Sequence, residues 1–272
     1  MTVAFYKLTG SGNDFVFLDG RTHGLEQWPC ERIAAVCDRR RGVGGDGLVL
    51  LTPEGANSVR MIYFNSDGGR AAMCGNAALC STRLASRLGL ADPAGMRLVT
   101  DAGTYDARCI GPGAMAEIHL ADFPAPAAVA GIQPVEGERI LGVATVGVPH
   151  LVALVDDIEA VDIQNRGRAL RFHPALGDAG ANANFVAPPV APGEPWLIRT
   201  YERGVEGETL ACGTGTVAAA VAVAASGGGE LPMQFRSRGG SPLSVSATLD
   251  QGRARDVWLC GEGRLVFTGE LS

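Results

Sequence analysis

The sequence predicts an α+β protein of two pseudo-symmetric domains, each a curved, mostly antiparallel sheet wrapped around a central helix. Three observations favour this fold class. The chain contains an internal repeat, each copy holds one helix that is apolar nearly all the way round, and short runs rich in β-branched and aromatic residues surround each helix. A helix without a polar face has to be enclosed, and short strands are the elements available to enclose it.

The first copy of the repeat combines a strand, a turn and a helix. Residues 59–64 (VRMIYF) have the composition of a strand. They lead into a turn at residues 65–69 (NSDGG), and Cys74 follows shortly after. A helix is predicted from Ala77 to Leu88, because the apolar run stops at a glycine suited to a C-terminal cap.

The second copy repeats this order. Residues 196–201 (WLIRTY) predict a strand and residues 202–207 (ERGVEG) a turn, and Cys212 follows. A second helix is predicted from about residue 215 to residue 225, ending in a serine and three glycines.

Spacing further along the chain supports a duplication. A glycine turn follows each of the two cysteines by 27 to 29 residues, at Gly103 and at Gly239. Residues 12–16 (GNDFV) and 182–186 (NANFV) form a looser third correspondence. The two copies agree in the order of their elements, in a cysteine and glycine followed by a polar residue, and in downstream spacing. This agreement favours duplication over chance.

The domain boundary is predicted at a proline-rich stretch. Residues 123–127 (FPAPA) are the best linker, since proline cannot continue a strand ladder. The first domain is expected over residues 1–122, completed by a C-terminal strand at about residues 262–272, and the second over residues 123–261.

Composition excludes several function classes. The 272 residues are 46% hydrophobic and carry a net charge of −6, which argues against nucleic-acid and membrane partners. No signal peptide and no apolar run long enough to span a bilayer is visible. The seven cysteines include no Cys-x-x-Cys and no paired histidines at zinc-finger spacing, so we expect no metal site and free thiols in the cytoplasm.

Each predicted helix follows a Cys-Gly pair, and that pattern points to acid/base chemistry. The first N–H groups of a helix lack partners and attract a carboxylate, and the same field lowers the pKa of a thiol. If the duplicated domains face one another, two thiols approach one substrate carbon from opposite sides. That symmetry suits inversion beside a carboxylate: a thiolate removes the α-proton from one face and a thiol returns a proton to the other.

The sequence also predicts that this chemistry needs no cofactor. The usual alternative, a pyridoxal Schiff base, requires a lysine. The chain has a single lysine, Lys7, and no recognisable phosphate-binding loop accompanies it.

The motifs resemble those of the diaminopimelate epimerase family, in the family's order and over nearly the whole chain. They are residues 7–15 (KLTGSGNDF), 73–76 (MCGN), 149–150 (PH), 182–186 (NANFV), 202–204 (ERG) and 208–215 (ETLACGTG). The resemblance implies a pyridoxal-independent isomerase of that family's fold. It would interconvert LL- and meso-diaminopimelate, a small-molecule substrate, in lysine biosynthesis, commonly as a homodimer.

The resemblance also implies a role for each matched residue. Cys74 and Cys212 would be the catalytic acid and base. Backbone N–H groups would hold the reacting carboxylate at Gly75, Asn76, Gly213 and Thr214. Side chains implied to contact the substrate are Asn13, Asn65, Asn182, Glu202 and Arg203, the last with a fork suited to the distal carboxylate. Glu202 and His150 would lie beside the thiols and help position the amino acid or move protons.

Three departures from the family pattern bear on the distal end of the substrate. Val148 stands where the family often has an asparagine before Pro-His. Ala77 and Leu79 stand where a glycine and an arginine are common, and Gly45 and Gly47 leave no side chain where some members place a glutamine.

Two other functions therefore remain as hypotheses. One is a related two-cysteine racemase of another amino acid, such as histidine or proline. The other is a non-catalytic redox or binding protein with a regulatory thiol pair. Separately, Asn13, Asn65 and Asn182 are residues typical of turns, and turn formation alone is an alternative explanation for each.

Overall fold

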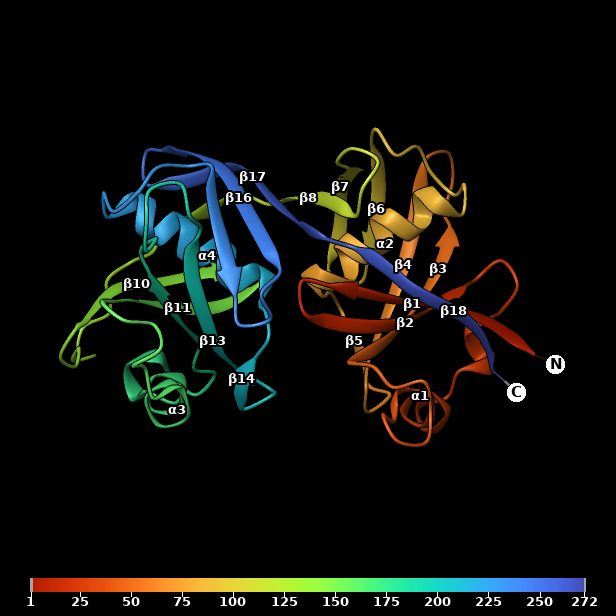
Figure 1. The fold of residues 1–272 in the computed structure, drawn as a ribbon, viewed down its shortest axis with the longest axis horizontal. Coiled ribbons are helices and arrows are strands. Elements are labelled where there is room, and N and C mark those ends of the chain that lie inside the picture. Colours follow the sequence, from red (N-terminus) through yellow and green to blue (C-terminus); the bar gives the residue numbers. More distant parts are fainter. Residues whose placement is uncertain (1, 272) are drawn as a thin grey trace. The chain divides into compact units, whose positions relative to one another are not determined.

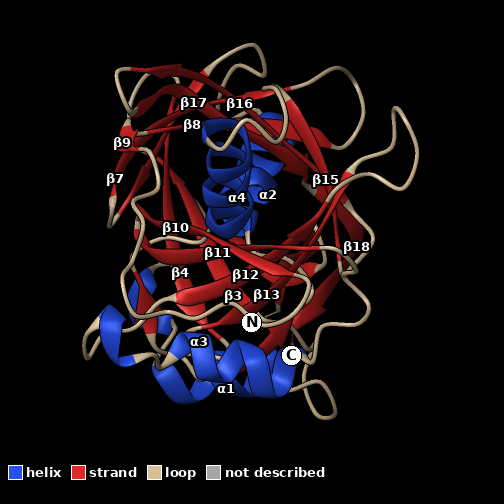
Figure 2. Ribbon diagram, turned by 90° about the vertical axis from the view of Figure 1, so that its left-hand side faces the viewer, coloured by secondary structure: helices blue, strands red, loops and turns tan. Residues whose placement is uncertain are grey.

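The computed structural model describes residues 2–271, and the chain divides into two compact units. Unit 1 consists of Met1–His119 with Cys260–Ser272, and unit 2 of Leu120–Leu259. In each unit, strands surround one long helix, α2 (Gly75–Arg87) in unit 1 and α4 (Gly213–Ala225) in unit 2 (Figures 1 and 2). This is the predicted α+β class.

Unit 1 opens with a hairpin, and a short helix, α1 (Cys30–Cys37), follows it. Its strands are β1 (Val3–Gly10), β2 (Asn13–Asp19), β3 (Gly47–Pro53), β4 (Ser58–Asn65), β5 (Arg70–Ala71), β6 (Met96–Thr100), β7 (Gly103–Cys109), β8 (Met115–Leu120) and β18 (Arg264–Leu271). The last strand, β18, pairs antiparallel with β1, so the C-terminal end of the chain forms part of the first sheet.

Unit 2 contains a second set of strands around α4. They are β9 (Phe123–Pro124), β10 (Glu138–Val146), β11 (Val148–Val155), β12 (Asn182–Ala187), β13 (Trp196–Glu202), β14 (Gly207–Thr209), β15 (Met233–Ser237), β16 (Pro242–Asp250) and β17 (Arg253–Glu262). A short helical segment precedes β12 and includes α3 (Arg168–Arg171).

The two units share one order of strand pairing. In unit 1, β1 and β2 are antiparallel, β2 and β3 parallel, β3 and β4 antiparallel, and β4 and β6 parallel. In unit 2, β10 and β11, β11 and β12, β12 and β13, and β13 and β15 repeat these orientations in the same sequence. The central helix follows β5 in one unit and β14 in the other. The internal repeat in the sequence is thus a repeat of topology.

The looser third correspondence is wrong. Residues 13–16 begin β2, whose counterpart by pairing is β11, whereas residues 182–186 form β12, the counterpart of β3. The two segments have similar sequences because each places an asparagine at the start of a largely buried strand.

Both central helices are enclosed, as their apolar sequences predict. Nine of the thirteen residues of α2 and ten of the thirteen of α4 are buried. Each helix begins two residues earlier than predicted, directly after its cysteine. Glycine is a poor helix former, so the sequence pattern places the start too late.

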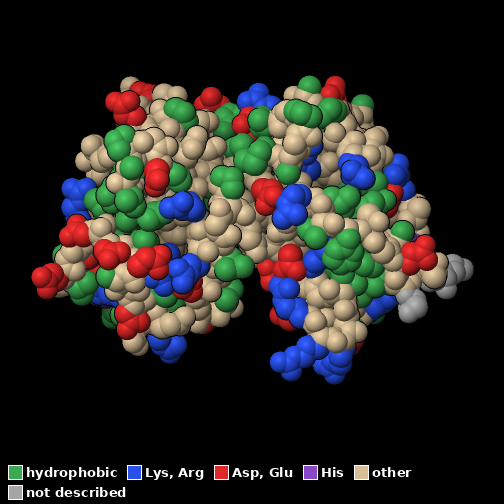
Figure 3. Space-filling model, viewed as in Figure 1, with side chains coloured by type: hydrophobic (Ala, Val, Ile, Leu, Met, Phe, Trp, Pro, Cys, Tyr) green, Lys and Arg blue, Asp and Glu red, His purple; other side chains and the backbone are tan. Residues whose placement is uncertain are grey.

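The surface carries charges of both signs. On the face shown in Figure 3, Lys and Arg side chains are interspersed with Asp and Glu over each unit. Within residues 2–271, no helix is both long enough and apolar enough to cross a membrane.

Candidate functional site

Each predicted catalytic cysteine is the N-cap residue of a central helix. Cys74 precedes α2 with φ −141° and ψ 122°, and Cys212 precedes α4 with φ −129° and ψ 107°. Both conformations are extended, as an N-cap requires. The sulfur of each residue therefore lies at the positive end of an enclosed helix, beside N–H groups that have no partner within the helix.

In unit 1, two predicted substrate contacts are joined by a hydrogen bond. Asn76, in the first turn of α2, donates from Nδ2 to Oδ1 of Asn13 over 2.6 Å. Asn13 in turn donates from Nδ2 to Oδ2 of Asp46 over 2.9 Å. Oδ1 of Asn76 is a buried acceptor with no protein partner among the described residues. An amino or hydroxyl group of a ligand at the start of α2 could donate to it.

A cluster of charged residues holds Asp46 in place. Arg39 donates to Oδ1 of Asp46 over 2.8 Å and to Oδ1 of Asp14 over 2.6 Å. Nζ of Lys7 lies 2.6 Å from Oδ2 of Asp14 and also donates to the carbonyl of Gly44. Burial raises the pKa of the Asp14 carboxyl, but hydrogen bonds from Arg39 and Lys7 outweigh it and hold the pKa below its ordinary value.

The strand register brings a third predicted contact, Asn65, to the same end of the sheet as Asn13. Asn13 begins β2, Gly47 begins β3, and Asn65 ends β4 directly opposite Gly47. The Asn65 side chain is exposed, and no hydrogen bond links it to the other predicted site residues within the described part of the chain. Its role stays a prediction.

The departure at Gly47 has a steric cause. A Cβ atom there would lie against the carbonyl oxygen of Phe64 and 2.6 Å from the ring of Tyr63. The Tyr63 ring, packed edge-on against Phe15, therefore occupies space that a side chain at position 47 would need.

Because a backbone atom cannot yield easily, Gly47→Ala is expected to destabilise unit 1 by about 1–3 kcal/mol. Chemical denaturation followed by circular dichroism measures this. Gly95→Ala is the matched control, since a Cβ there meets open space and the change should cost less than about 0.5 kcal/mol. Equal stabilities of the two variants would contradict this packing.

In unit 2, hydrogen bonds connect five predicted site residues. Oδ1 of Asn182 accepts the backbone N–H of Arg203 over 2.6 Å, and Nδ2 of Asn182 lies 3.4 Å from Nδ1 of His150. Nε2 of His150 lies 3.0 Å from Oγ1 of Thr214, which is 3.8 Å from the sulfur of Cys212. The chain of contacts thus ends at the thiol.

His150 is fully buried, and this sets its charge. Burial, and then the positive charge of Arg203, lowers the pKa of the imidazole to about 3. His150 is therefore neutral at physiological pH. Its bonded neighbour is the Thr214 hydroxyl.

Glu202 and Arg203 lie at the end of β13, where Glu202 pairs with Gly207 of β14. Both residues are half-buried. The register of β12 and β13 puts the start of one strand beside the end of the other, so Asn182 and Arg203 meet at one edge of the sheet. The predicted contact of the Arg203 side chain with the substrate stays a prediction.

Sequence reasoning missed several residues that hold these groups in place: Lys7, Arg39, Asp46, Asn184 and Thr200. The Arg39-Arg40-Arg41 triplet looks like a solvated helix end, yet Arg39 turns back to two carboxylates. Asn184 could have been found as a polar residue within a strand whose six residues are all buried.

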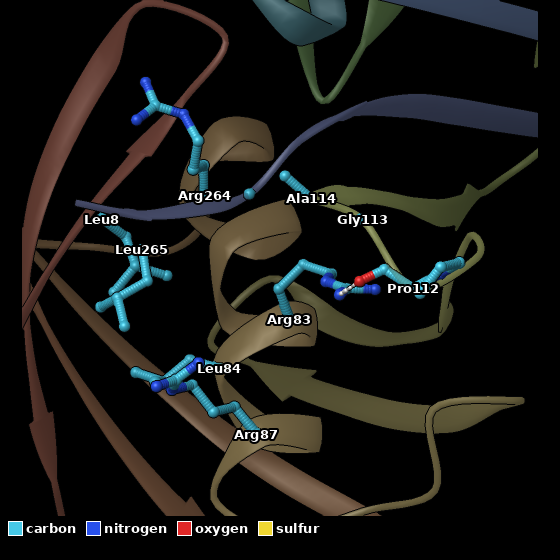
Figure 4. Close-up of a pocket in the computed structure, with 10 residues that line it drawn as sticks. Leu8, Arg83, Leu84, Arg87, Pro112, Gly113, Ala114, Arg264 and Leu265 are labelled. Carbon is cyan, nitrogen blue, oxygen red and sulfur yellow. Dashed lines mark hydrogen bonds between the residues drawn. The ribbon is translucent and has the colours of Figure 1, made fainter.

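A cavity of about 210 Å³ lies elsewhere in unit 1, beside the C-terminal half of α2 (Figure 4). Two of its three arginines already have partners. Arg83 donates to the carbonyls of Gly111 and Pro112, and Arg264 pairs with Glu262 over 2.6 Å. No predicted site residue lines this cavity, so it is not part of the candidate site.

Solved structures with this fold include isomerases. A phenazine biosynthesis protein of the PhzF family from Bacillus anthracis superposes with a TM-score of 0.74 at 12% identity, covering 100% of this chain and 99% of the other. A hydroxyproline epimerase from Agrobacterium vitis superposes with a TM-score of 0.66 at 18% identity, covering 99% and 92%. At 12% and 18% identity, these superpositions show that the chain shares the fold of both proteins.

Sequence comparison shows that the chain is an isomerase of the epimerase class and identifies its family. The family model described as diaminopimelate epimerase matches residues 5–116 and 142–255. A diaminopimelate epimerase from Gemmatimonas aurantiaca is 44% identical over 279 residues, covering 99% of each chain. The chain belongs to the diaminopimelate epimerase family, as its motifs predict.

Proposed function

We propose that this enzyme interconverts LL- and meso-diaminopimelate by moving a proton at Cα between two cysteines. The observation that carries the proposal is the matched pair of N-cap cysteines, one per unit, in a chain 44% identical to a diaminopimelate epimerase. In the proposed reaction one cysteine, as thiolate, takes the α-proton from one face of the carbon. The other, as thiol, gives its proton to the opposite face, so the protein's proton count is unchanged.

In the proposed reaction, the N-terminal ends of α2 and α4 stabilise the negative charge that develops on the substrate. Charge builds on the carboxylate as the α-proton leaves, and donors already aimed at that carboxylate lower the barrier. We assign this role to the backbone N–H groups of Gly75, Asn76, Gly213 and Thr214, which form the first turns of α2 and α4. The proposal requires both first turns to face the same substrate carbon during the reaction.

The side chains proposed to hold the rest of the substrate are polar. Two of them connect to the first turns of the helices, Asn13 through Asn76 and Asn182 through His150 and Thr214. Asn13 and Asn65 come from unit 1, and Asn182, Glu202 and Arg203 from unit 2. Arg203 is the residue we assign to the distal carboxylate, because a guanidinium can donate two parallel hydrogen bonds to it.

The reaction is proposed to run without pyridoxal phosphate. A Schiff base needs a free lysine amine. Lys7 is 6% exposed, paired with Asp14 and hydrogen-bonded to the carbonyl of Gly44, and it is the only lysine of the chain. These bonds favour a structural role for its ammonium group.

The setting of the enzyme is proposed from its family and composition. We assign it to lysine biosynthesis in the cytoplasm, as a homodimer that binds neither nucleic acid nor membrane. The net charge of −6 and seven cysteines without disulfides among the described residues support this setting.

A substrate panel in deuterium oxide tests the substrate. We expect deuterium at Cα of LL- and meso-diaminopimelate and none in histidine or proline. Exchange with histidine or proline but not with diaminopimelate would identify a related racemase instead. No exchange with any amino acid would favour a redox or binding role for the thiols.

A further inference from the structure

The orientation of one buried amide in unit 2 is determined by its neighbours. Asn184 places Nδ2 3.0 Å from the backbone carbonyl of Leu151, and its Oδ1 lies 3.0 Å from the hydroxyl of Thr200. A carbonyl oxygen can only accept, so the amide must present its NH₂ group to Leu151. The Thr200 hydroxyl then donates to Oδ1.

This orientation determines which nitrogen of His150 carries the proton. Nδ2 of Asn184 also lies 3.4 Å from Nδ1 of His150. Asn182 makes the same approach at 3.4 Å, and its orientation is determined as well, because its Oδ1 accepts the N–H of Arg203. The Asn184 amide also lies 3.4 Å from the backbone carbonyl of Asn182, so Asn182 is the stronger case for a donor to Nδ1. Since only NH₂ groups face Nδ1, that nitrogen must accept, and the proton of the neutral ring is on Nε2.

The tautomer in turn orients a hydroxyl at the start of α4. Nε2 of His150 lies 3.0 Å from Oγ1 of Thr214 and, carrying the proton, donates to it. The Thr214 hydroxyl then has its own proton to donate elsewhere. The sulfur of Cys212 lies 3.8 Å from Oγ1, within reach for a bond to sulfur.

We propose that His150 is a positioning residue whose fixed tautomer directs the Thr214 hydroxyl proton at the Cys212 sulfur, where it stabilises the thiolate. The histidine neither gives nor takes a proton in this arrangement. The inference rests on the proposed function only in making that thiolate the catalytic base. Arg203 is the charged side chain that acts on the His150 ring, and it favours the neutral form.

The close packing at this helix start supports the assignment. A Cβ atom on Gly215 would run into Oδ1 of Asn184 and lie 3.2 Å from the Cys212 sulfur. The Asn184 amide therefore packs directly against the first turn of α4, beside the Cys212 sulfur.

Unit 1 has a different residue at the equivalent position. Asn76 occupies the place after Cys74 that Thr214 occupies after Cys212, and its NH₂ group donates to Asn13. The residue two positions after the cysteine is thus an asparagine in unit 1 and a threonine in unit 2, although the two cysteines cap equivalent helices. Cys74 therefore serves as an internal control in the same molecule.

The first test measures the pH dependence of alkylation by iodoacetamide, with mass spectrometry to follow the Cys212 and Cys74 peptides separately. Thr214→Val is expected to raise the midpoint of the Cys212 curve by about half to one pH unit, from the loss of one hydrogen bond. Thr214→Ser should restore it. Thr216→Val is the matched control, because that hydroxyl bonds the Cys212 backbone carbonyl and leaves the sulfur alone. The Cys74 curve should not move in any variant.

The second test needs no variant. In the ¹⁵N spectrum of the wild-type protein, His150 should show a protonated Nε2 and an unprotonated Nδ1, unchanged between pH 5 and 8. A proton on Nδ1, or a Cys212 midpoint unaffected by Thr214→Val, would overturn the proposal. Neither readout uses turnover, so either result stands apart from the identity of the substrate.

Discussion

Cys74→Ala and Cys212→Ala are each expected to lower kcat/KM for diaminopimelate epimerisation by about 10³-fold or more. General acid/base catalysis contributes about 10²–10⁴-fold, and the proposed reaction uses both thiols in each turnover. Alanine removes the proton-carrying group and leaves the helix in place, since the cysteine side chains make no cap hydrogen bond to α2 or α4.

A coupled assay specific for meso-diaminopimelate measures the loss, and circular dichroism checks the fold. Cys109→Ala is the control, because Cys109 is half-buried like Cys74 but lies on β7, with its sulfur directed at the carbonyl of Thr82 in the middle of α2. It should retain most of the activity. Near-normal turnover in either of the first two variants would refute the two-thiol mechanism.

Lys7→Met is expected to destabilise unit 1 by about 2–3 kcal/mol, below the usual cost of about 3–5 kcal/mol for breaking a buried ion pair, because Arg39 still pairs with Asp14. The Lys7 side chain is 8% exposed and that of Asp14 23%, so the remaining carboxylate stays largely shielded from water. Arg39 bridges Asp14 and Asp46, and Asp46 holds Asn13. The variant should therefore also raise KM.

Chemical denaturation at several pH values measures this effect. A carboxyl whose pKa is lowered by folding adds stability above its unfolded pKa of about 3.9 and loses it as the pH falls through the folded value. Because Asp14 is such a group, the difference between wild type and variant should shrink below about pH 3.9.

Arg21→Met is the control for Lys7→Met. Arg21 donates to both oxygens of the Asp19 carboxylate, but its side chain is 46% exposed, so its loss should cost less than about 1 kcal/mol. If both variants lost the same stability, the Lys7 ion pair would have no special structural role.

Much of the fold could be predicted from the sequence because the signals are local and doubled. An apolar helix after a Cys-Gly pair is visible in residues 75–87 and again in residues 213–225. The strands before these helices have either alternating apolar and polar residues or a continuous apolar run. In the structure these strands pair in the same order in both units. The repeat made each signal more specific than it would be alone.

The supporting network could not be predicted because it depends on contacts far apart in the chain. Asp46 reaches Asn13 across 33 positions, and His150 reaches Thr214 across 64. Nothing local distinguishes Asp46 from a turn residue of a glycine-rich loop. Lys7 is singled out by being the only lysine, but only the folded register shows its carboxylate partner, Asp14.

The return of β18 to β1 affects how the protein is made. Translation delivers residues 3–10 before unit 2 and residues 264–271 after it, yet these two segments are hydrogen-bonded neighbours. While the ribosome is still synthesising unit 2, β1 has one of its two partner strands and an open edge on the other side. Unit 1 can therefore complete its sheet only after unit 2 has been synthesised, whereas unit 2 has all its strands at that point.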